Sequence, residues 1–459
     1  MSDEIVVRSP YDGAEVGRVP KRSADDVDRA VRAAATALRD EPLPPWRRAQ
    51  VLETAARLLA DRAEDLAGII AREAAKPIKT ARVEAKRAVS TFTFAAVEAR
   101  RLTGDMVPVD AAEIGEGRLA FTLRVPIGVV AAISPFNFPL NLVAHKLAPA
   151  IAAGCPVVLK PASQTPLSAM ALAHLLVDEC GLPAGYLHVV TGPGSEVGGA
   201  LVEHPDVAYV TFTGSSEVGW GIAAKAGRKK VALELGNNSP VILEADGDWD
   251  MAARTISTAG FAHAGQSCVS VQRIYVAAEV EEAFTATLAK LVDGLVVGDP
   301  LDEATDVSAL ITEGERDRVK AWIDEAVAGG ARVVAGGEVE NGVLRPTVLA
   351  GVTPDMKVCR DEVFGPVVAI QAYESLDEAL RLADDTRYGL QAGIFTSRLA
   401  SALRAARELH FGTVLVNEVP TWRADQMPYG GVRESGNTKE GPASAVREMT
   451  EERLVVIRP

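Results

Sequence analysis

Cys268 is the residue of this 459-residue chain best suited to attack a carbonyl carbon. It ends the segment GQSC, whose small neighbours leave the thiol accessible, and a thiolate is a strong nucleophile. Cys155 lies in the apolar segment AAGCPVV and is better read as a small buried hydrophobe. We assign no nearby general base in the sequence to Cys180 or Cys359. On local grounds Cys268 is equally consistent with a nucleophile and with an ordinary loop cysteine.

Three further residues have the chemistry that a thiol nucleophile needs. Glu234 interrupts the apolar strand VALELG, where a buried acid is either a general base or half of a structural ion pair. Glu362, in DEVFGP, is a similar case. Asn137 lies in SPFNFP between two aromatic residues and two prolines. A rigid amide there can donate to an oxyanion, or the residue can cap a helix.

Two segments have features of a nucleotide site. The strand VAYVTF runs into a turn from Gly214 to Gly219 and then a helix, and backbone N–H groups at such a turn favour a phosphate. The turn is not a G-x-G-x-x-G fingerprint, so an ordinary capped turn remains open. Lys160 ends a strand, where it faces a ligand crevice or solvent. The six histidines are scattered without metal-ligand spacing, so we expect no metal site.

These residues lie in a pattern of alternating strands and helices. The first quarter reads as a helical layer with solvated charges, including helices at 26–40 and 45–101. From residue 128 onward, apolar strands alternate with helices, which predicts a parallel sheet covered on both faces. The expected strands are 128–134, 155–161, 186–192, 207–214 and 229–236, with helices at 138–153 and 167–180. Ligands bind beyond the carboxyl ends of such strands.

A second unit of the same class follows. Its expected strands include 239–244, 271–277 and 412–417, with a helical stretch at 248–265. Between the helical layer and the first sheet, the β-rich segments 106–111 and 118–126 predict a projecting hairpin. The final residues, 452–459, read as a strand that leaves the second unit.

Composition narrows the class of protein. The formal charge of −14 argues against a nucleic-acid partner, and 48% hydrophobic with 24% charged residues argues against disorder. The longest apolar-rich run is broken by Lys146 and Lys160, so we expect no membrane partner. Four cysteines without C-x-x-C pairing and an acidic start without an apolar signal core predict a cytoplasmic protein.

Each motif is weak alone, but their order along the chain resembles the aldehyde dehydrogenase superfamily. The resemblance implies an α/β fold with a Rossmann-like parallel-sheet cofactor domain, an α/β catalytic domain and a small β oligomerisation arm. Carried onto this sequence, the cofactor domain is 1–105 and 127–234, the arm 106–126 and 450–459, and the catalytic domain 235–427, with 428–449 returning to the cofactor domain. The family usually assembles as dimers or tetramers, so we expect a homodimer or homotetramer.

The resemblance also implies roles for individual residues. Cys268 matches the nucleophile that forms a thiohemiacetal and then a thioester, Asn137 the oxyanion donor, and Glu234 the base that activates water. NAD or NADP is the implied cofactor. Lys160 and Glu362 match its two ribose contacts, and Phe364 its nicotinamide neighbour. The full expected cofactor set is Ser134, Pro135, Phe136, Lys160, Ser163, Gly214, Ser215, Val218, Gly219, Leu235, Glu362 and Phe364.

Departures from the family pattern bear on specificity. Ser163 stands where many NAD-preferring members have glutamate, so nothing there repels a 2′-phosphate and NADP is expected to be accepted. The expected substrate pocket is polar and favours a small anionic or hydroxylated aldehyde: Asn141, His145, Ser267, Arg423 and Tyr429. The motifs resemble members acting on lactaldehyde, glyceraldehyde phosphate or phosphonoacetaldehyde, although Ser267 replaces an arginine typical of phosphate-handling members.

Three alternatives stay open. Arg423 can instead pair with Asp425 at the surface. The enzyme can be of the coenzyme-A-acylating type, which has no need of Glu234. The chain can also be a redox-inactive structural paralogue, against which the intact set of Cys268, Glu234 and Asn137 argues.

Overall fold

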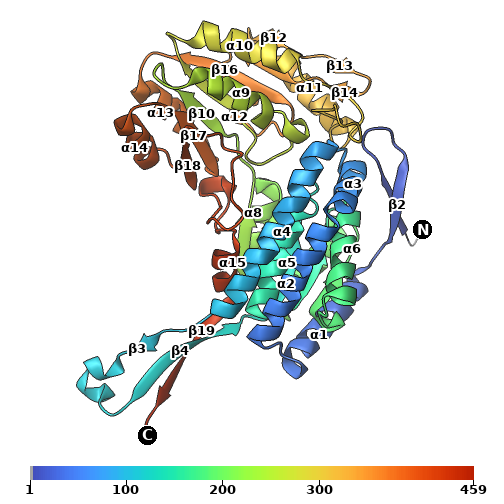
Figure 1. Ribbon diagram of the computed structural model, residues 1–459, viewed down its shortest axis with the longest axis vertical. Coiled ribbons are helices and arrows are strands. Elements are labelled where there is room, and N and C mark those ends of the chain that lie inside the picture. The colour runs from blue at the N-terminus through green and yellow to red at the C-terminus, as the bar shows by residue number, and fades with distance from the viewer. Residues whose placement is uncertain (1–3) are drawn as a thin grey trace.

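The computed structural model describes residues 4–459 as two α/β units and a projecting β-sheet (Figure 1). Residues 1–3, which belong to the predicted cofactor domain and to the acidic start, lie outside the described range. The α-helices are α1 (Ala24–Asp40), α2 (Pro45–Asp61), α3 (Ala63–Ala74), α4 (Ile78–Arg101), α5 (Asn141–Ala153), α6 (Leu167–His174), α7 (Gly199–Glu203), α8 (Ser216–Lys225), α9 (Trp249–Ala259), α10 (Glu281–Asp293), α11 (Glu313–Ala328), α12 (Lys357–Arg360), α13 (Leu376–Asp384), α14 (Leu399–Glu408) and α15 (Pro442–Glu448).

The strands form five sheets within the described range. They are β1 (Glu4–Arg8), β2 (Glu15–Pro20), β3 (Met106–Val107), β4 (Leu119–Pro126), β5 (Val129–Ile133), β6 (Val157–Lys160), β7 (Leu187–Val189), β8 (Val207–Thr213), β9 (Lys230–Glu234), β10 (Pro240–Leu243), β11 (Arg273–Ala277), β12 (Arg332–Ala335), β13 (Val339–Glu340), β14 (Val343–Leu344), β15 (Thr347–Ala350), β16 (Val367–Tyr373), β17 (Gln391–Phe395), β18 (Thr413–Val416) and β19 (Thr450–Ile457).

The first unit is built on a parallel five-stranded sheet of order β7-β6-β5-β8-β9. All five residues of the central strand β5 are buried. Val130 and Ala132 pack with α2, α3, α4 and α5, whereas Val129 and Ala131 pack with α1 and α7 on the opposite face. Alternating burial of this kind requires helices on both faces, as the strand pattern predicted. The α/β fold class is therefore confirmed.

Register brings the ends of four strands to one edge of this sheet. Ile133 pairs with Lys160 on one side and with Phe212 on the other, and Thr213 pairs with Glu234. Because the strands are parallel, their carboxyl ends meet at the same edge, where Lys160 and Glu234 are the last residues of their strands.

The second unit has a seven-stranded sheet of order β12-β15-β16-β11-β10-β17-β18. Its strands are parallel except β12, which is antiparallel at one edge. Val241 and Leu243 of β10 pack toward α9 and α10, and Ile242 packs toward α13 and α14. This sheet and its helices form the upper part of Figure 1.

The predicted hairpin is present as an antiparallel sheet of order β19-β4-β3 that projects from the first unit (Figure 1). Its first strand is only Met106–Val107, because a 3₁₀ turn at Val109–Ala111 ends it within the expected segment, and a second turn at Glu113–Gly115 follows in the connector. The C-terminal strand pairs along all of β4, from Thr450 opposite Pro126 to Ile457 opposite Leu119. Its role in oligomerisation stays a prediction.

The first quarter is mostly helical, as the sequence predicts, but it differs from the expectation in two respects. Residues 4–20 form the hairpin β1–β2, which the sequence analysis missed because only Val7 and Val19 of its hydrophobic residues are fully buried. The charges of the helical layer are also not all solvated, since Glu73, Lys76 and Glu84 are buried.

Candidate active site

The nucleophile candidate follows an irregular turn at the start of the second unit. Cys268 is half-buried, whereas the other three cysteines are buried. His263, Ala264 and Gly265 have φ values of 51°, 53° and 70°, a left-handed run that is costly for the first two residues. A Cβ at Gly265 would lie 2.1 Å from the carbonyl oxygen of Gly365, so the turn accepts only glycine there. The turn thus fixes the position of the thiol.

The surroundings of Cys268 hold the thiol in its neutral form. Burial above all, together with the charges of Glu362 and Glu234, raises the pKa of Cys268 to about 12, against a hydrogen bond with Tyr429 that lowers it. The Sγ atom lies 3.1 Å from the Tyr429 hydroxyl. Attack by sulfur therefore requires that the proton be removed as the new bond forms.

Asn137 lies beside this turn, in the loop between β5 and α5. Its Nδ2 atom donates to the carbonyl oxygen of Gln266 at 2.8 Å, two residues before the thiol. The alternative role as helix cap is wrong, because Leu140 is the N-cap of α5 and makes no side-chain cap. The second Nδ2 hydrogen is free to serve an oxyanion.

Glu234 ends β9 with 5% of its surface exposed. Neither carboxylate oxygen has a hydrogen-bond partner among the described residues, so the alternative of a structural ion pair is wrong. Burial and the negative charge of Glu440 raise the pKa of Glu234 well above its ordinary value. A Cβ at Gly430 would come within 2.7 Å of Glu234 Oε1, so glycine makes room for the carboxylate. An unengaged buried carboxyl group suits a general base.

A buried charge cluster lies against the other side of the thiol. Arg423 stacks on the Tyr429 ring, 3.9 Å from its centroid, and pairs with Glu440 at 2.9 Å. Its side chain is only 6% exposed, and its Nε atom has no partner among the described residues. The alternative of a surface pair with Asp425 is wrong, because Asp425 pairs with Arg87 at 2.9 Å.

His145 and Asn141 complete this cluster from α5. Both reach the same oxygen of Asp425, His145 at 3.1 Å and Asn141 at 3.3 Å. Burial lowers the pKa of His145, against the carboxylates of Glu440 and Asp425, which raise it. Burial also acts on Glu440, but the neighbouring basic groups, His145 and Arg423 among them, outweigh it and lower the pKa of Glu440 to about 2. The cluster therefore sets the guanidinium groups of Arg423 and Arg87 against the carboxylates of Glu440 and Asp425, with the His145 ring between the two carboxylates.

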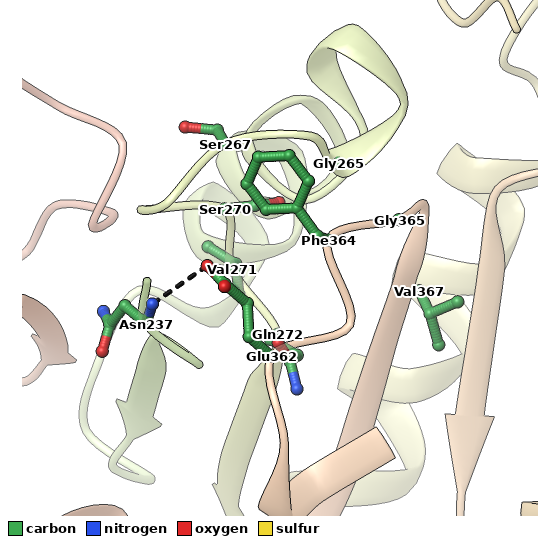
Figure 2. A pocket seen from close by; sticks show the side chains of 10 residues that line it. All are labelled: Asn237, Gly265, Ser267, Ser270, Val271, Gln272, Glu362, Phe364, Gly365 and Val367. Atoms are coloured by element: carbon green, nitrogen blue, oxygen red, sulfur yellow. Dashed lines mark hydrogen bonds between the residues drawn. The ribbon is translucent and has the colours of Figure 1, made fainter. Parts of the chain in front are cut away.

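The cofactor candidates of the second unit surround a small pocket (Figure 2). Phe364 has a positive φ of 47° and meets Phe136 edge to face at 5.8 Å. Glu362 accepts a hydrogen bond from the Asn237 backbone at 3.0 Å, and burial raises its pKa to about 7. Ser267 lines the same pocket, next to the ring of Phe364 in Figure 2.

The candidates of the first unit lie at the carboxyl edge of the parallel sheet. Lys160 is 5% exposed and donates to Pro161, so it is not a solvated strand end, and Ser163 donates to Gly192. Ser215 is the N-cap of α8 without a side-chain cap, which leaves the first N–H groups of the helix available.

The packing of residues at this carboxyl edge of the sheet is also compatible with a bound nucleotide. A Cβ at Gly219 would lie 2.3 Å from a side-chain methyl group of Leu235, so glycine lets α8 pack against this residue without moving its side chain. Gly214 donates its backbone N–H to the backbone carbonyl oxygen of Glu234, and Val218 is exposed on α8. The buried Ser134 hydroxyl, which precedes Pro135, has no partner among the described residues. An uncapped helix start and an orphaned hydroxyl are what a bound phosphate and ribose would satisfy.

Sequence reasoning missed several buried polar residues around the site. Lys146 donates to Thr211 and Thr213, and burial lowers its pKa to about 8. The others are Asp425, Glu440, Arg87, Lys76 and Glu84. Glu440 and Asp425 stand in polar segments without any periodic signal, and the remaining charges belong to helical patterns that suit a solvated face equally well.

The described residues, 4–459, contain no group of three or more His, Cys, Asp or Glu side chains that could hold a metal ion. No helix among them is both long and apolar enough to cross a membrane.

A partly exposed thiol, an unengaged carboxyl group and a nucleotide-type strand edge together define a dinucleotide-dependent oxidoreductase with a cysteine nucleophile. The chain belongs to the aldehyde dehydrogenase family, which matches residues 1–455. The predicted superfamily, the enzyme class of NAD(P)-dependent aldehyde dehydrogenase and the choice of NAD or NADP as cofactor are confirmed.

Individual relatives are similar over nearly the whole chain. The 3-sulfolactaldehyde dehydrogenase of Priestia aryabhattai is 48% identical, covering 99% of this chain and 95% of its own. Aspartate-semialdehyde dehydrogenase 1 of Pseudomonas canavaninivorans is 40% identical, with coverage of 99% and 96%. The crystal structure of the glyceraldehyde-3-phosphate dehydrogenase GapN from Methanocaldococcus jannaschii, complexed with NADP, superposes with a TM-score of 0.95 at 36% identity and full coverage of both chains.

Proposed function

We propose that this enzyme oxidises a small anionic or hydroxylated aldehyde to its carboxylic acid through a thioester on Cys268, and that it accepts NADP alongside NAD. The observation that carries the substrate class is Arg423. Its buried guanidinium stacks on Tyr429, whose hydroxyl touches the thiol, and its Nε–H has no partner among the described residues.

The first step is addition of sulfur to the aldehyde carbon. The thiol proton passes to solvent as the C–S bond forms, which leaves the unengaged Glu234 carboxylate for the later hydrolysis. The developing oxyanion is placed to accept from Asn137 Nδ2 and from the Cys268 backbone N–H, which together lower the barrier to the tetrahedral state. This step links the substrate covalently to Cys268 as a thiohemiacetal.

Oxidation and hydrolysis follow at the same carbon. The hydride leaves from this carbon, and bound NAD or NADP would supply the acceptor for it. Glu362 and Lys160 would hold its ribose hydroxyl groups, the start of α8 its phosphates, and Phe364 its nicotinamide side. In hydrolysis, Glu234 takes a proton from water as the water oxygen bonds to the thioester carbon. The C–S bond then breaks and releases the acid.

The charge pattern of the pocket supports an anionic or hydroxyl-bearing substrate. Arg423 and Arg87 are each balanced by one carboxylate, so an added anion meets no excess of negative charge. The three relatives named above take their names from aldehydes that carry a sulfonate, a carboxylate or a phosphate. Ser267, in place of an arginine, weakens the case for a phosphate.

The test is a steady-state comparison of matched aldehydes with both cofactors. Succinic semialdehyde and butanal have equal carbon chains but differ in the terminal carboxylate, and lactaldehyde represents a neutral hydroxylated substrate. We expect kcat/KM for the anionic or hydroxylated member to exceed that of butanal by about tenfold or more, the scale of one ionic hydrogen bond. Equal or better kcat/KM with butanal would refute the substrate class.

Coenzyme A provides the test of the acylating alternative. Because Glu234 is present and unengaged, we expect turnover to be independent of coenzyme A. Absence of cofactor reduction with every aldehyde would instead revive the redox-inactive alternative.

We also propose a homodimer or homotetramer in the cytoplasm. The sheet of β3, β4 and β19 exposes apolar side chains on both faces, Leu119, Leu123 and Ile457 on one and Leu454 and Val456 on the other, which suits subunit contact. The four free cysteines suit a reducing compartment.

A further inference from the structure

The loop that carries Asn137 is held at two points by one buried ion pair from the helical layer. Lys76, between α3 and α4, donates to the carbonyl oxygen of Asn137 at 2.6 Å. Glu84, on α4, pairs with Lys76 and accepts the backbone N–H groups of Leu140 at 2.9 Å and Asn141 at 3.1 Å. One residue of the pair thus holds the loop at Asn137, and the other holds it where α5 begins.

Each charge of this pair is fully engaged. The Lys76 ammonium also lies 3.8 Å above the ring of Phe138, the residue after Asn137. The carboxylate of Glu84 sits at the N-terminus of α5, where the helix dipole favours a negative charge. Lys76 is 0% and Glu84 1% exposed, so water does not compete for these contacts.

Stability alone does not explain such a pair. Removing two charges from water carries a desolvation cost that their attraction need not exceed, and apolar replacements of similar volume are often tolerated. The pair does, however, fix the backbone on both sides of one amide side chain. That amide must be aimed accurately, because an oxyanion donor acts only over hydrogen-bond distance.

The pair also lies close to the turn that precedes the nucleophile. The positive charge of Lys76 adds to burial in lowering the pKa of His263, the first left-handed residue of that turn. The ring of His263 in turn lies edge to face with Phe138, at 6.5 Å. Lys76 therefore borders both the oxyanion loop and the nucleophile turn.

We propose that Lys76 and Glu84 are positioning residues that aim the Asn137 amide at the oxyanion formed on the substrate of Cys268. This inference rests on the proposed function, because it assumes the oxyanion role of Asn137. Neither residue of the pair contacts Cys268 or Glu234 in the described structure, so both act through the loop.

The test is a double-mutant cycle with Asn137→Ala. We expect Asn137→Ala to lower the rate of the first turnover about 10²–10³-fold. Lys76→Met, which keeps the length of the side chain but removes its charge, is expected to lower the same rate about 10–100-fold with little change in KM. In the Asn137→Ala background, we expect Lys76→Met to lower the rate less than threefold further, because its target is already gone.

Glu84→Gln keeps the proposal testable if Lys76→Met does not fold. It keeps an oxygen for Leu140 and Asn141 but loses the negative charge, and we expect a loss of about tenfold that also vanishes in the Asn137→Ala background. The rate at which iodoacetamide alkylates Cys268 is expected to stay within twofold of wild type in every folded variant, since the thiol itself is not altered.

Glu73 provides a matched control. It is also a buried carboxylate that accepts two backbone N–H groups at the start of a helix, those of Leu167 and Ser168 in α6. Glu73→Gln is expected to lower the melting temperature but to leave the first-turnover rate within twofold, which separates loss of helix anchoring from loss of oxyanion geometry.

The outcomes distinguish this inference from the proposed function. A first-turnover rate within twofold of wild type in folded Lys76→Met or Glu84→Gln overturns the inference while Asn137→Ala remains impaired. The inference is also overturned if the loss of first-turnover rate in Lys76→Met or Glu84→Gln multiplies in full with the loss in Asn137→Ala, because the two sites then act independently. If Asn137→Ala itself retains the wild-type rate, the oxyanion role in the proposed function fails first.

Discussion

The two sides of Cys268 differ in how completely their charged groups are engaged. On the oxyanion side, Lys76 and Glu84 form a closed set in which both charges have several partners. On the substrate side, both oxygens of Glu234 and the Nε atom of Arg423 have none among the described residues. Buried polar atoms are rarely left unpaired without a reason. We infer that the closed side sets geometry, whereas the open side meets water, protons and substrate.

The largest effect should come from removing the sulfur between the two sides. We expect Cys268→Ala to lower turnover by more than about 10³-fold, because removal of a covalent nucleophile leaves only binding and oxyanion stabilisation. Steady-state cofactor reduction measures it. The control is Cys180→Ala, which replaces a buried cysteine of the first unit and should leave turnover within twofold of wild type. Comparable activity of Cys268→Ala and wild type would exclude covalent catalysis at this residue.

Replacing the free carboxylate should separate the two halves of the reaction. We expect Glu234→Gln to give one burst of reduced cofactor and then turnover slowed by about 10²–10³-fold, because water loses its base. Stopped-flow absorbance measures both phases. If Glu234→Gln abolishes the burst as well as slowing turnover, Glu234 is also required to deprotonate the thiol.

The same carboxylate predicts a pH dependence. Its pKa in the folded protein is raised, so the ionised form that can act as a base is scarce at low pH and increases as the pH rises through that pKa. Turnover limited by hydrolysis should therefore rise with pH over a range well above the usual titration of a glutamate. A pH profile already flat from pH 5 upward would contradict the raised pKa.

Some of these features can be predicted from the sequence and others cannot, depending on the kind of pattern that each leaves in the sequence. The strands that end at Lys160 and Glu234 are apolar runs, and their parallel pairing follows from the helices between them, so the sheet edge was predictable. The turn at Cys268 and the loop at Asn137 were found because unusual residue types stand at strand and helix ends.

The closed side was not predictable in the same way. Lys76 and Glu84 lie in an Ala-, Arg- and Glu-rich stretch whose charges read equally well as solvated, and only tertiary packing of α4 against α5 buries them. Glu440 and Asp425 were missed because pairing between residues nearly 300 positions apart, as for His145 and Asp425, leaves no local pattern.

A smaller effect is expected at the open guanidinium. Arg423→Lys keeps the positive charge but loses the planar set of donors, so we expect the preference for succinic semialdehyde over butanal to fall about tenfold or more. The ratio of the two kcat/KM values measures it, and butanal is the internal control for any change in the thiol. An unchanged ratio would show that Arg423 serves only its pair with Glu440.

The smallest effect is expected at Ser163, away from both sides of the thiol. Ser163→Glu would place a carboxylate near the expected ribose site, so we expect kcat/KM with NADP to fall about tenfold relative to NAD through repulsion of the 2′-phosphate. Ser163→Gln is the matched control, because it adds the same bulk without charge and also removes the serine hydroxyl that donates to Gly192. If the glutamine variant discriminates as strongly as the glutamate variant, size rather than charge governs cofactor choice at this position.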